Sequence, residues 1–583
     1  MQPAPRGRGT GGSEPRSSRP TLALVLATLS LTAGPPGAAE GKPKRAVETP
    51  PKVGAAAARE KPKPALVLPE VSVSAADIQR HTQALAAIAQ DPALSTGDRG
   101  SRTRQYIAEQ LYESGLAPGG DGEHGAAGLL QAVPLQGQSS MLQGRPRFVG
   151  TSTTIPVQVT VAARELVLWS GLPQPEVSVK DSELVFIGYG ITAAERAWDD
   201  YKGIDVRGKT VLMLDGLPRE LSAAGVAYRG AGRYAQKFSE ALRRGAIAAV
   251  LIHSPSQSEH SLDTLRAYFG SERLLAPLAR DGVALQAAGY LHDEAARRVL
   301  LAGGLDLEAQ QQAAETREFT PQSLRVRMSA QLKNQTRSVD SANVVGILAG
   351  SDEAARGEAV VISTHHDHLS AIADGSGGQQ LLPGVRDRLV GVAGLLAMAQ
   401  ATRRQAPARR SLIFAVLGGH SESFVGAQRL IKRLPAPAQR VVAQINIDGL
   451  NVGPASAELV QIGRGKSTLD ELLDSVAKAT GRTVIADRKP ERGLLYRSES
   501  LVFARAAAPV LFLAPPDLEQ YLTTDYLRPS DTLRESFSFA GAAQDCALLY
   551  QLGWLTADSP TPPYFVPGDE FAPRAPAAPS AAP

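Results

Sequence analysis

Side chains that could bind a metal ion follow three short apolar runs in the second half of the chain. His365 and Asp367 lie in "HHDH" after the first run, His420 lies in "GHSE" after the second, and Asp448 ends the third in "NIDG". Asp387 lies in a turn between the first two runs. One histidine and two carboxylates suit zinc, with a coordination position left open for water. This combination indicates hydrolytic chemistry.

The spacing within "HHDH" predicts how these side chains point. In an extended segment residues i and i+2 share a face, so His365 and Asp367 point together while His366 and His368 point away. His365 can then ligate a cation while Asp367 accepts its other ring N–H. The alternative interpretation is that "HHDH" is only a polar strand end.

The carboxylates come from the neighbouring connections. Asp387 and Asp448 would complete a metal site with His365, or serve only as turn and helix-cap residues.

The runs themselves predict the scaffold. "EAVVIST", "SLIFAVLG" and "VVAQINI" are four to eight residues long and rich in β-branched residues, as in buried strands of an α/β sheet. "APVLFLAP" reads as a further strand, and apolar helices follow "PGVRD" and close the domain near "AGAAQDCALLYQLGWLTA". Because an open α/β sheet places its site beyond the carboxyl ends of its strands, these polar groups are expected to meet there.

Several motifs together resemble the co-catalytic di-zinc aminopeptidases, the group that includes glutamate carboxypeptidase and the non-peptidase transferrin receptor. The matching motifs are "NVVGILAG", "HHDH", "GVRDRLVG", "NID", "YRSESLVFARAAAPVLFL" and "DYLRPSDT". The resemblance implies a three-layer α/β/α zinc-exopeptidase-like domain with a mixed sheet. It also implies that His365, Asp387 and Asp448 are zinc ligands, and that peptides are substrates or ligands.

The sequence departs from the family at positions that carry chemistry. Where the family has paired Glu residues, the base and a ligand, this chain has His420 and Ser421. Leu527 stands where the family has a late histidine ligand, and no histidine follows His420. The resemblance therefore implies at most one well-held zinc ion. His420, or Glu422 after a shift of the loop, is then the expected base; Arg388 beside Asp387 could instead pair with the carboxylates in place of a cation.

The N-terminus is expected to be an export signal. Arginines precede the twelve-residue run "TLALVLATLSLT", and small residues follow up to Ala39. This order is typical of a secretory signal peptide over residues 1–39, and twelve residues are too few to span a bilayer. An uncleaved anchor is the alternative. We therefore expect a periplasmic or extracellular protein without a transmembrane anchor.

Composition narrows the class further. The 583 residues carry a net charge of +4 without a Lys/Arg block, which argues against nucleic acid as a partner. The single cysteine, Cys546, excludes an intrachain disulfide and is expected in the core.

The domain boundaries follow from composition and periodicity. Residues 40–68 are an Ala/Pro/Lys-rich linker, and residues 69–145 are two helices that we attach to the main domain of residues 331–565. Residues 146–330 resemble an inserted β-rich protease-associated domain. Residues 566–583 are predicted to be a disordered tail. His81 is expected on the solvated face of its helix.

Two functional hypotheses remain. The first is an exported zinc metallopeptidase of the aminopeptidase type, which removes N-terminal residues from peptides. The second is a catalytically inactive homologue that binds a peptide or protein in the same cleft. The feature that distinguishes the two hypotheses is the set of departures at His420, Ser421, Leu527 and Arg388, because fold alone does not decide function.

Overall fold

The computed structural model describes residues 66–151, 157–193, 196–223, 234–255, 258, 261–278, 282–368, 371–373, 379–420 and 424–573. These residues lie within one compact unit, Ala65–Pro583. The predicted signal peptide and nearly all of the predicted linker lie outside the described residues. Among the residues that are described, no helix is both long and apolar enough to cross a membrane.

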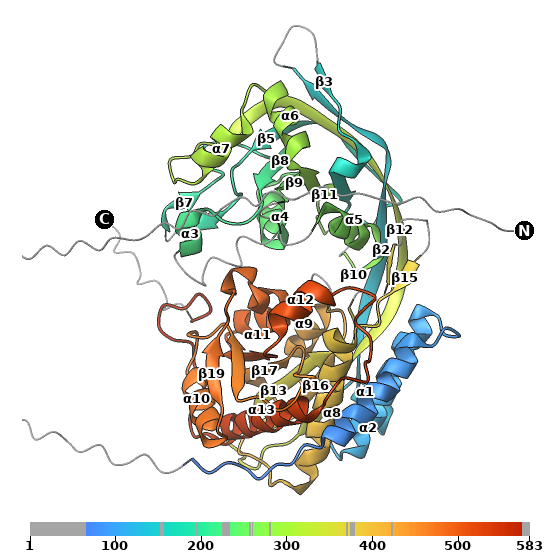
Figure 1. Ribbon diagram of the computed structural model, residues 1–583, viewed down its shortest axis with the longest axis vertical. Helices are drawn as coiled ribbons and strands as arrows, with labels where there is room; N and C mark the ends of the chain where they lie inside the picture. Colours follow the sequence, from blue (N-terminus) through green and yellow to red (C-terminus); the bar gives the residue numbers. More distant parts are fainter. Residues whose placement is uncertain are drawn as a thin grey trace, which may run out of the picture. The chain divides into compact units, whose positions relative to one another are not determined.

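A mixed sheet with helices on both faces forms the region around the candidate site, as predicted. Its strand order is β19-β18-β20-β17-β13-β16-β12. The strands are β12 (Gln322–Leu348), β13 (Glu358–His365), β16 (Ser411–Leu417), β17 (Arg440–Ile447), β18 (Glu458–Ile462), β19 (Thr483–Ala486) and β20 (Val510–Ala514). The helices are α1 (Ala75–Gln90), α2 (Thr96–Glu113), α8 (Val390–Ala401), α9 (Val425–Lys432), α10 (Leu469–Ala479), α11 (Ser500–Arg505), α12 (Leu518–Thr524) and α13 (Ala540–Asp558) (Figure 1).

Alternating residues of β13 enter different cores, which establishes the three layers. Val360 and Ile362 pack into a core that includes residues of α2, α8 and α13. Ala359 and Val361 pack on the opposite face, with residues of α9 and α11. Consecutive strand residues point to opposite faces, so a strand buried on both sides must be apolar throughout. That requirement is why the unbroken apolar runs predicted these strands.

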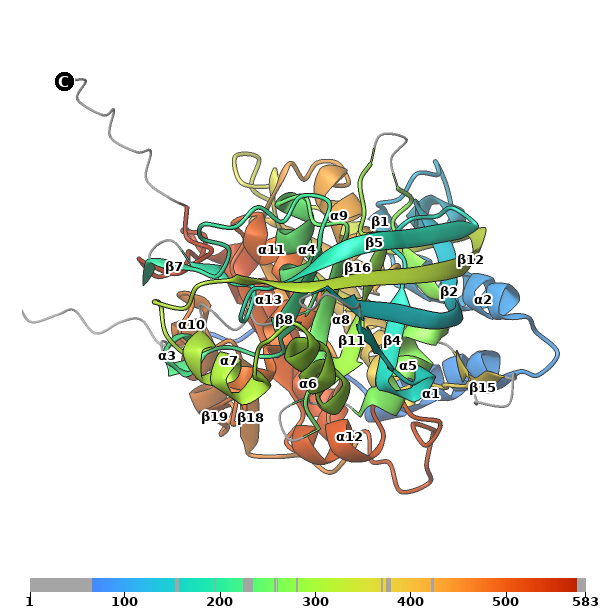
Figure 2. The same cartoon turned by 90° about the horizontal axis from the view of Figure 1, so that it is seen from above.

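Two long antiparallel strands connect this sheet to the region of residues 146–330. β2 (Leu130–Gly150) pairs with β12 along most of its length. β12 also pairs with β5 (Glu176–Phe186) near its start and with β16 near its end. Figure 2 shows β2, β5 and β12 side by side. Both predicted boundaries of the insert, near residues 146 and 330, therefore fall inside continuous strands.

The described part of residues 146–330 continues the same sheet beyond β12 with mostly parallel strands and adds helices, whereas we expected a β-rich domain. β5, β8, β9 and β11 are parallel neighbours, and β4 is antiparallel to β11. Further elements are β3 (Val157–Val159), β4 (Leu166–Trp169), β8 (Thr210–Leu214), β9 (Ala248–His253), β10 (Arg273–Leu275), β11 (Ala287–His292), α3 (Arg219–Ala223), α4 (Tyr234–Arg243), α5 (Leu262–Gly270), α6 (Asp293–Ala302) and α7 (Leu307–Ala314). Parallel strands need crossovers, and these are largely helical here. Its identity as a protease-associated domain stays a prediction.

The C-terminal segment is ordered further than predicted. Lys466 forms ion pairs with Asp569 at 3.0 Å and with Glu570 at 2.8 Å, and both carboxylates belong to the predicted tail. Phe571 packs against the core that contains Phe565. The charge of a buried lysine requires such partners, which explains why residues 566–573 pack against the domain. Residues 574–583 lie outside the described part.

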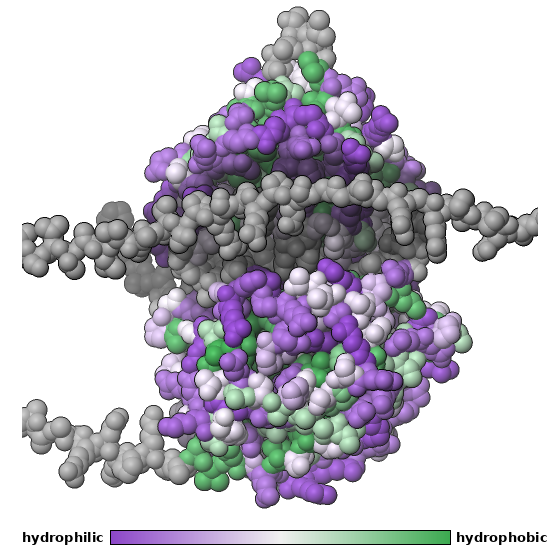
Figure 3. Space-filling view, viewed as in Figure 1, coloured by the Kyte–Doolittle hydropathy of each residue, from purple (hydrophilic) through white to green (hydrophobic). Residues whose placement is uncertain are grey.

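Apolar side chains on the surface do not suggest a function by themselves. On the face seen in Figure 3, hydrophobic residues are interspersed with hydrophilic ones. The exposed large hydrophobic side chains among the described residues are Leu66, Val67, Tyr112, Met141, Val157, Val283, Leu301, Leu381 and Tyr564. They come from separate elements, and scattered residues of this kind are normal on soluble proteins.

His81 is buried between helices rather than solvated, which corrects the sequence prediction. Its Nδ1 lies 2.7 Å from the Tyr106 hydroxyl, and its Nε2 accepts a hydrogen bond from the Gln400 amide at 3.1 Å. Burial, together with the charge of Arg80, lowers the pKa of His81 from 6.5 to about 4. The neutral ring is therefore the form that the fold accommodates.

This burial predicts a pH dependence of stability. Because the folded-state pKa lies below the unfolded value, the contribution of His81 is present above pH 6.5 and is lost as the pH falls toward about 4. Between about pH 7.5 and about pH 5 we expect the wild-type free energy of unfolding to fall by about 1–2 kcal/mol more than that of His81→Gln. Urea titration followed by tryptophan fluorescence measures both. Equal losses in the two proteins would contradict this explanation.

Candidate metal centre

The predicted site residues gather at one edge of the sheet. β13 is parallel to both β16 and β17, with His365 opposite Leu417 and Ser363 opposite Asn446. Parallel neighbours end at the same edge, so the residues that follow these strands meet there. The edge therefore carries His365, the turn of His420 and, after β17, Asp448.

His365 presents one nitrogen to this site. Its side chain is 1 % exposed, and its Nδ1 donates to the backbone carbonyl of Asp367 at 2.9 Å. No hydrogen bond from the described residues reaches its Nε2, which forms an ion pair with Asp448 Oδ1 at 3.6 Å. Burial opposes ionisation of the ring, but Asp448, Glu499 and Asp387 together raise the pKa of His365 to about 10. Without a bound ion the site thus carries a proton on His365.

Asp367 orients His365 through its backbone oxygen, not through its carboxylate as predicted. The carboxylate accepts the backbone N–H groups of Gly419 at 2.8 Å and His420 at 3.0 Å. It therefore fixes the turn after β16. The reason for the difference is that β13 ends at His365, so the alternation of a strand no longer applies beyond it.

The same end of β13 explains the positions of the other two histidines of the motif. His366 points away, as predicted, with its Nε2 2.9 Å from the Ala342 carbonyl. His368 does not point away, which corrects the prediction: its Nδ1 lies 2.8 Å from Asp387 Oδ2. Burial disfavours the charged form and lowers the pKa of His368, although Asp387 acts in the opposite direction.

Asp387 sits in a turn that a second buried carboxylate holds. It belongs to a π-helical turn, Val385–Leu389, that leads into α8. Asp531 accepts the backbone N–H of Arg386 at 2.9 Å and of Asp387 at 3.1 Å. Burial, with the charge of Asp387, raises the pKa of Asp531 to about 6. Burial opposes ionisation of Asp387, but His368 holds the pKa of that carboxyl below its usual range. The sequence motif "DYLRPSDT" contains Asp531, but its hydrogen bonds were not predicted.

Arg388 does not take the role of a cation in the site. Its guanidinium donates to the backbone carbonyls of His366 at 3.4 Å, Leu382 at 3.1 Å and Pro383 at 3.0 Å. Among the described residues no ion pair joins it to Asp387 or Asp448. Arg388 therefore braces the loops on either side of the turn.

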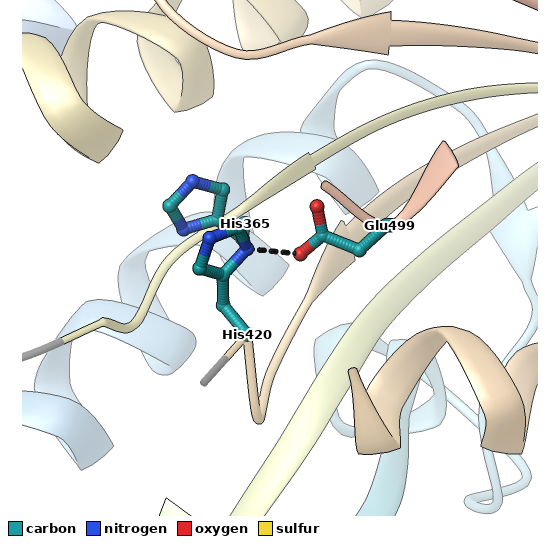
Figure 4. Close-up of side chains that lie close together, drawn as sticks. All are labelled: His365, His420 and Glu499. Atoms are coloured by element: carbon teal, nitrogen blue, oxygen red, sulfur yellow. Dashed lines mark hydrogen bonds and ion pairs between the residues drawn. The ribbon is translucent and has the colours of Figure 1, made fainter. Parts of the chain in front are cut away.

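His420 is paired with a carboxylate that sequence reasoning did not assign a role. Its Nδ1 lies 2.6 Å from Glu499 Oε1, and its ring stacks on that of His365 with centroids 3.6 Å apart and planes at 17° (Figure 4). Glu499 precedes α11, is 1 % exposed, and has no hydrogen-bond partner for Oε2. Burial opposes ionisation, but His420 lowers the pKa of Glu499. The motif "YRSES" was the signal that could have identified it.

Among the described residues, the remaining predicted ligands do not complete a second metal site. Ser421 and Glu422 lie outside the described residues, and Leu527 offers no ligand atom. Within the described part of the chain, His365, His420 and Glu499 bring one ligand atom each within 4.8 Å of one another. His365, Asp387 and Asp448 do not form such a group there. Nitrogen and oxygen donors of these types suit zinc, and the Nε2 of His365 is a fitting ligand atom for one ion.

A cleft of about 610 Å³, its open mouth included, leads to these groups. Asp387, His420 and Asp448 contribute its polar floor, together with Arg386 and Arg497. Its other lining residues are Gly449, Leu494, Phe512, Pro515, Leu518, Tyr521, Leu522 and Tyr526. A mostly apolar lining with a few convergent polar groups is typical of a ligand-binding site.

Comparison with known proteins gives one family match, over part of the chain. Residues 343–549 match the family model described as peptidase family M28. No curated protein sequence matches the chain.

Solved structures similar to this chain include an aminopeptidase from Aneurinibacillus sp. strain AM-1, with 17 % identity, 83 % of this chain and 94 % of that chain covered, and a TM-score of 0.49. A zinc aminopeptidase from Bacillus subtilis has 16 % identity, coverage of 83 % and 95 %, and a TM-score of 0.43. A peptidase M28 precursor from Shewanella amazonensis has 15 % identity, coverage of 84 % and 98 %, and a TM-score of 0.37.

Proposed function

We propose that this protein, whose residues 343–549 form an M28 peptidase domain, is an exported zinc-dependent hydrolase that removes N-terminal residues from peptides. The observation that carries the proposal is the meeting of a buried histidine and a carboxylate at the cleft, where His365 Nε2 lies 3.6 Å from Asp448 Oδ1. A buried nitrogen without a hydrogen bond is costly, and a metal ion is a partner that this donor set suits.

The residues present suit zinc, and they suit one ion rather than two. His365 and Asp448 would hold it, and Asp387 is the third ligand that the sequence predicts. A bound zinc ion polarises the scissile carbonyl and lowers the pKa of a bound water. Asp387 has one carboxylate oxygen on His368, which leaves its other oxygen for the site.

The side chains that line the cleft can bind the free N-terminal end of a peptide. Asp387 and Asp448 line the cleft and can attract the α-ammonium group of a free N-terminus, while Arg386 and Arg497 in the same lining can bind a carbonyl or carboxylate oxygen. The apolar lining, which includes Phe512 and Leu522, can enclose the side chain of the first residue and exclude water. This combination favours a peptide with a free amino end over one with a blocked end.

The proton of the attacking water needs an acceptor near the carbonyl. The sequence predicts His420 or Glu422 for this role. His420 lines the cleft, which keeps that assignment open, while Glu422 lies outside the described residues. Both assignments stay predictions.

The proposed function is tested with the purified chain without the predicted signal peptide and without a metal-binding tag. We expect hydrolysis of a leucine or phenylalanine chromogenic anilide that is lost on chelation and restored by zinc. The matched control is the same substrate with an acetylated amino group, which we expect to be cleaved at least about 100-fold more slowly, because it lacks the charge that Asp387 and Asp448 attract. Zinc-independent turnover, or equal rates on both substrates, would contradict the proposal.

A second candidate function is peptide binding without turnover. Leu527 at the late ligand position and the contact of His368 with Asp387 favour it, because both reduce the metal-binding capacity of the site. A peptide with a free N-terminus would then bind the zinc-treated protein and remain intact. Equilibrium binding of a fluorescent peptide, measured beside the hydrolysis assay, distinguishes the two functions.

A further inference from the structure

The three side chains drawn in Figure 4 come from three separate segments and converge at one point. His365 ends β13, His420 follows β16, and Glu499 immediately precedes α11. One ligand atom from each lies within 4.8 Å of the other two. None of these segments is near another in sequence, so the convergence is a property of the fold.

Two of these side chains carry buried polar atoms that no hydrogen bond from the described residues satisfies. Glu499 Oε2 has no such partner, and His365 Nε2 has only the ion pair with Asp448 Oδ1 at 3.6 Å, although each side chain is 1 % exposed. An unsatisfied buried polar group costs about 1–3 kcal/mol, and more when it is charged. Two such atoms in one cluster indicate a missing partner that can accept electron pairs from both nitrogen and oxygen. A divalent metal ion has that property.

We propose that His365, His420 and Glu499 bind a single zinc-class divalent ion, a ligand set that replaces the set of His365, Asp387 and Asp448. The inference deepens the proposed function, since the ion would be the same one that this function requires. It changes which residues hold that ion.

The surroundings of Asp387 support the replacement. Its Oδ2 is 2.8 Å from His368, and its backbone N–H is held by Asp531. Asp387 thus has partners in the fold as it stands, whereas His365 and Glu499 each have an atom without a hydrogen bond from the described residues. Asp448 Oδ1, 3.6 Å from His365 Nε2 and on the cleft side, can serve as a further donor.

Ion binding requires a defined proton release. His420 Nδ1 and Glu499 Oε1 are 2.6 Å apart and share one proton. An ion held by this set would replace two protons, the one on His365 Nε2 and the one between His420 and Glu499, and both would leave for solvent; the two nearly parallel rings would have to tilt for their lone pairs to converge. In that arrangement His420 is a metal ligand, so another group of the cleft would have to accept the proton during hydrolysis.

The test measures metal binding directly. Full-length chain is stripped with chelator and titrated with zinc or Co²⁺, and bound metal is read by elemental analysis and by the visible absorption of Co²⁺. We expect about one ion per wild-type chain. We expect Glu499→Gln and His420→Asn to weaken binding at least about 100-fold, because even an outer partner of a ligand is worth 10–100-fold. The matched variant Asp387→Asn should change affinity less than about threefold.

The outcomes separate the inference from the proposed function. Loss of the ion in Asp387→Asn with retention in Glu499→Gln overturns the inference, even if the wild type hydrolyses peptides. Absence of a wild-type ion overturns it as well. Metal bound by the expected set without any hydrolysis supports the inference and contradicts the function. Glu499→Asp keeps a carboxylate and should restore part of the affinity; if it binds no better than Glu499→Gln while both remain folded by circular dichroism, the inference fails.

Discussion

The His365→Asn variant is expected to lose both bound metal and peptide hydrolysis, by more than about 100-fold each. His365 belongs to both ligand sets, and its Nε2 is a buried nitrogen that no hydrogen bond from the described residues reaches. Replacing even an outer partner of a metal ligand costs 10–100-fold, so removal of a ligand itself should exceed that. Metal content by elemental analysis and initial rates on the leucine anilide measure the two losses.

His366→Asn is the matched control for this variant. His366 is the adjacent residue, is also buried, and contacts the Ala342 carbonyl rather than the site. The same chemical change there should leave the metal content near that of the wild type, whatever it does to stability. If His366→Asn and His365→Asn lose metal equally, the loss reports general disruption of the end of β13. Retention of the ion in His365→Asn would remove His365 from both ligand sets.

Gly426→Ala is expected to lower the free energy of unfolding by about 3 kcal/mol, the upper part of the range for overpacking. A Cβ atom at this position would lie 2.1 Å from the carbonyl oxygen of Gly418 and 2.3 Å from Asn343 Oδ1. Gly418 also accepts the Gly426 N–H at 2.9 Å, so the clash is with backbone that cannot move independently. Because Gly418 lies two residues before His420, the displacement should also reduce hydrolysis. Thermal unfolding and the anilide assay follow the two effects.

Gly270→Ala provides the comparison for the glycine substitution. Gly270 ends α5, and no heavy atom lies within 4 Å of the Cβ that alanine would add. There the substitution should be neutral or stabilising by up to about 1 kcal/mol, because alanine loses less backbone entropy. A Gly426→Ala protein as stable as Gly270→Ala would mean that the turn after β16 is looser than its contacts indicate.

Local patterns were sufficient to predict the scaffold and the approximate position of the site. "EAVVIST" and "VVAQINI" became β13 and β17, because a strand buried on both faces must be apolar throughout. Since parallel strands end at one edge, the polar residues after them had to meet, as His365 and Asp448 do. The prediction that Cys546 is buried also holds. Such features depend on a few neighbouring residues and on the geometry of parallel pairing.

The region of residues 146–330 and the chain ends show where composition was insufficient. Strand runs separated by glycines were read as β-rich, but crossover helices such as α4, which connects the parallel strands β8 and β9, make the region α/β. Lys466 holds Asp569 and Glu570, although nothing in their local sequence indicates that contact. Long-range pairing of this kind is set by burial of charge and not by periodicity.

The chemistry of the site was decided by the tertiary structure. The sequence by itself determined which residues stand at the strand ends, and it predicts that ligands for a second ion are missing. It did not determine that His368 turns toward Asp387, because its position depends on where β13 ends. Nor did it determine that His420 meets Glu499, 79 residues later in the chain. Strand periodicity fixes directions only within one element, whereas a ligand set requires side chains from several elements to converge within a few ångströms, and only their packing produces that.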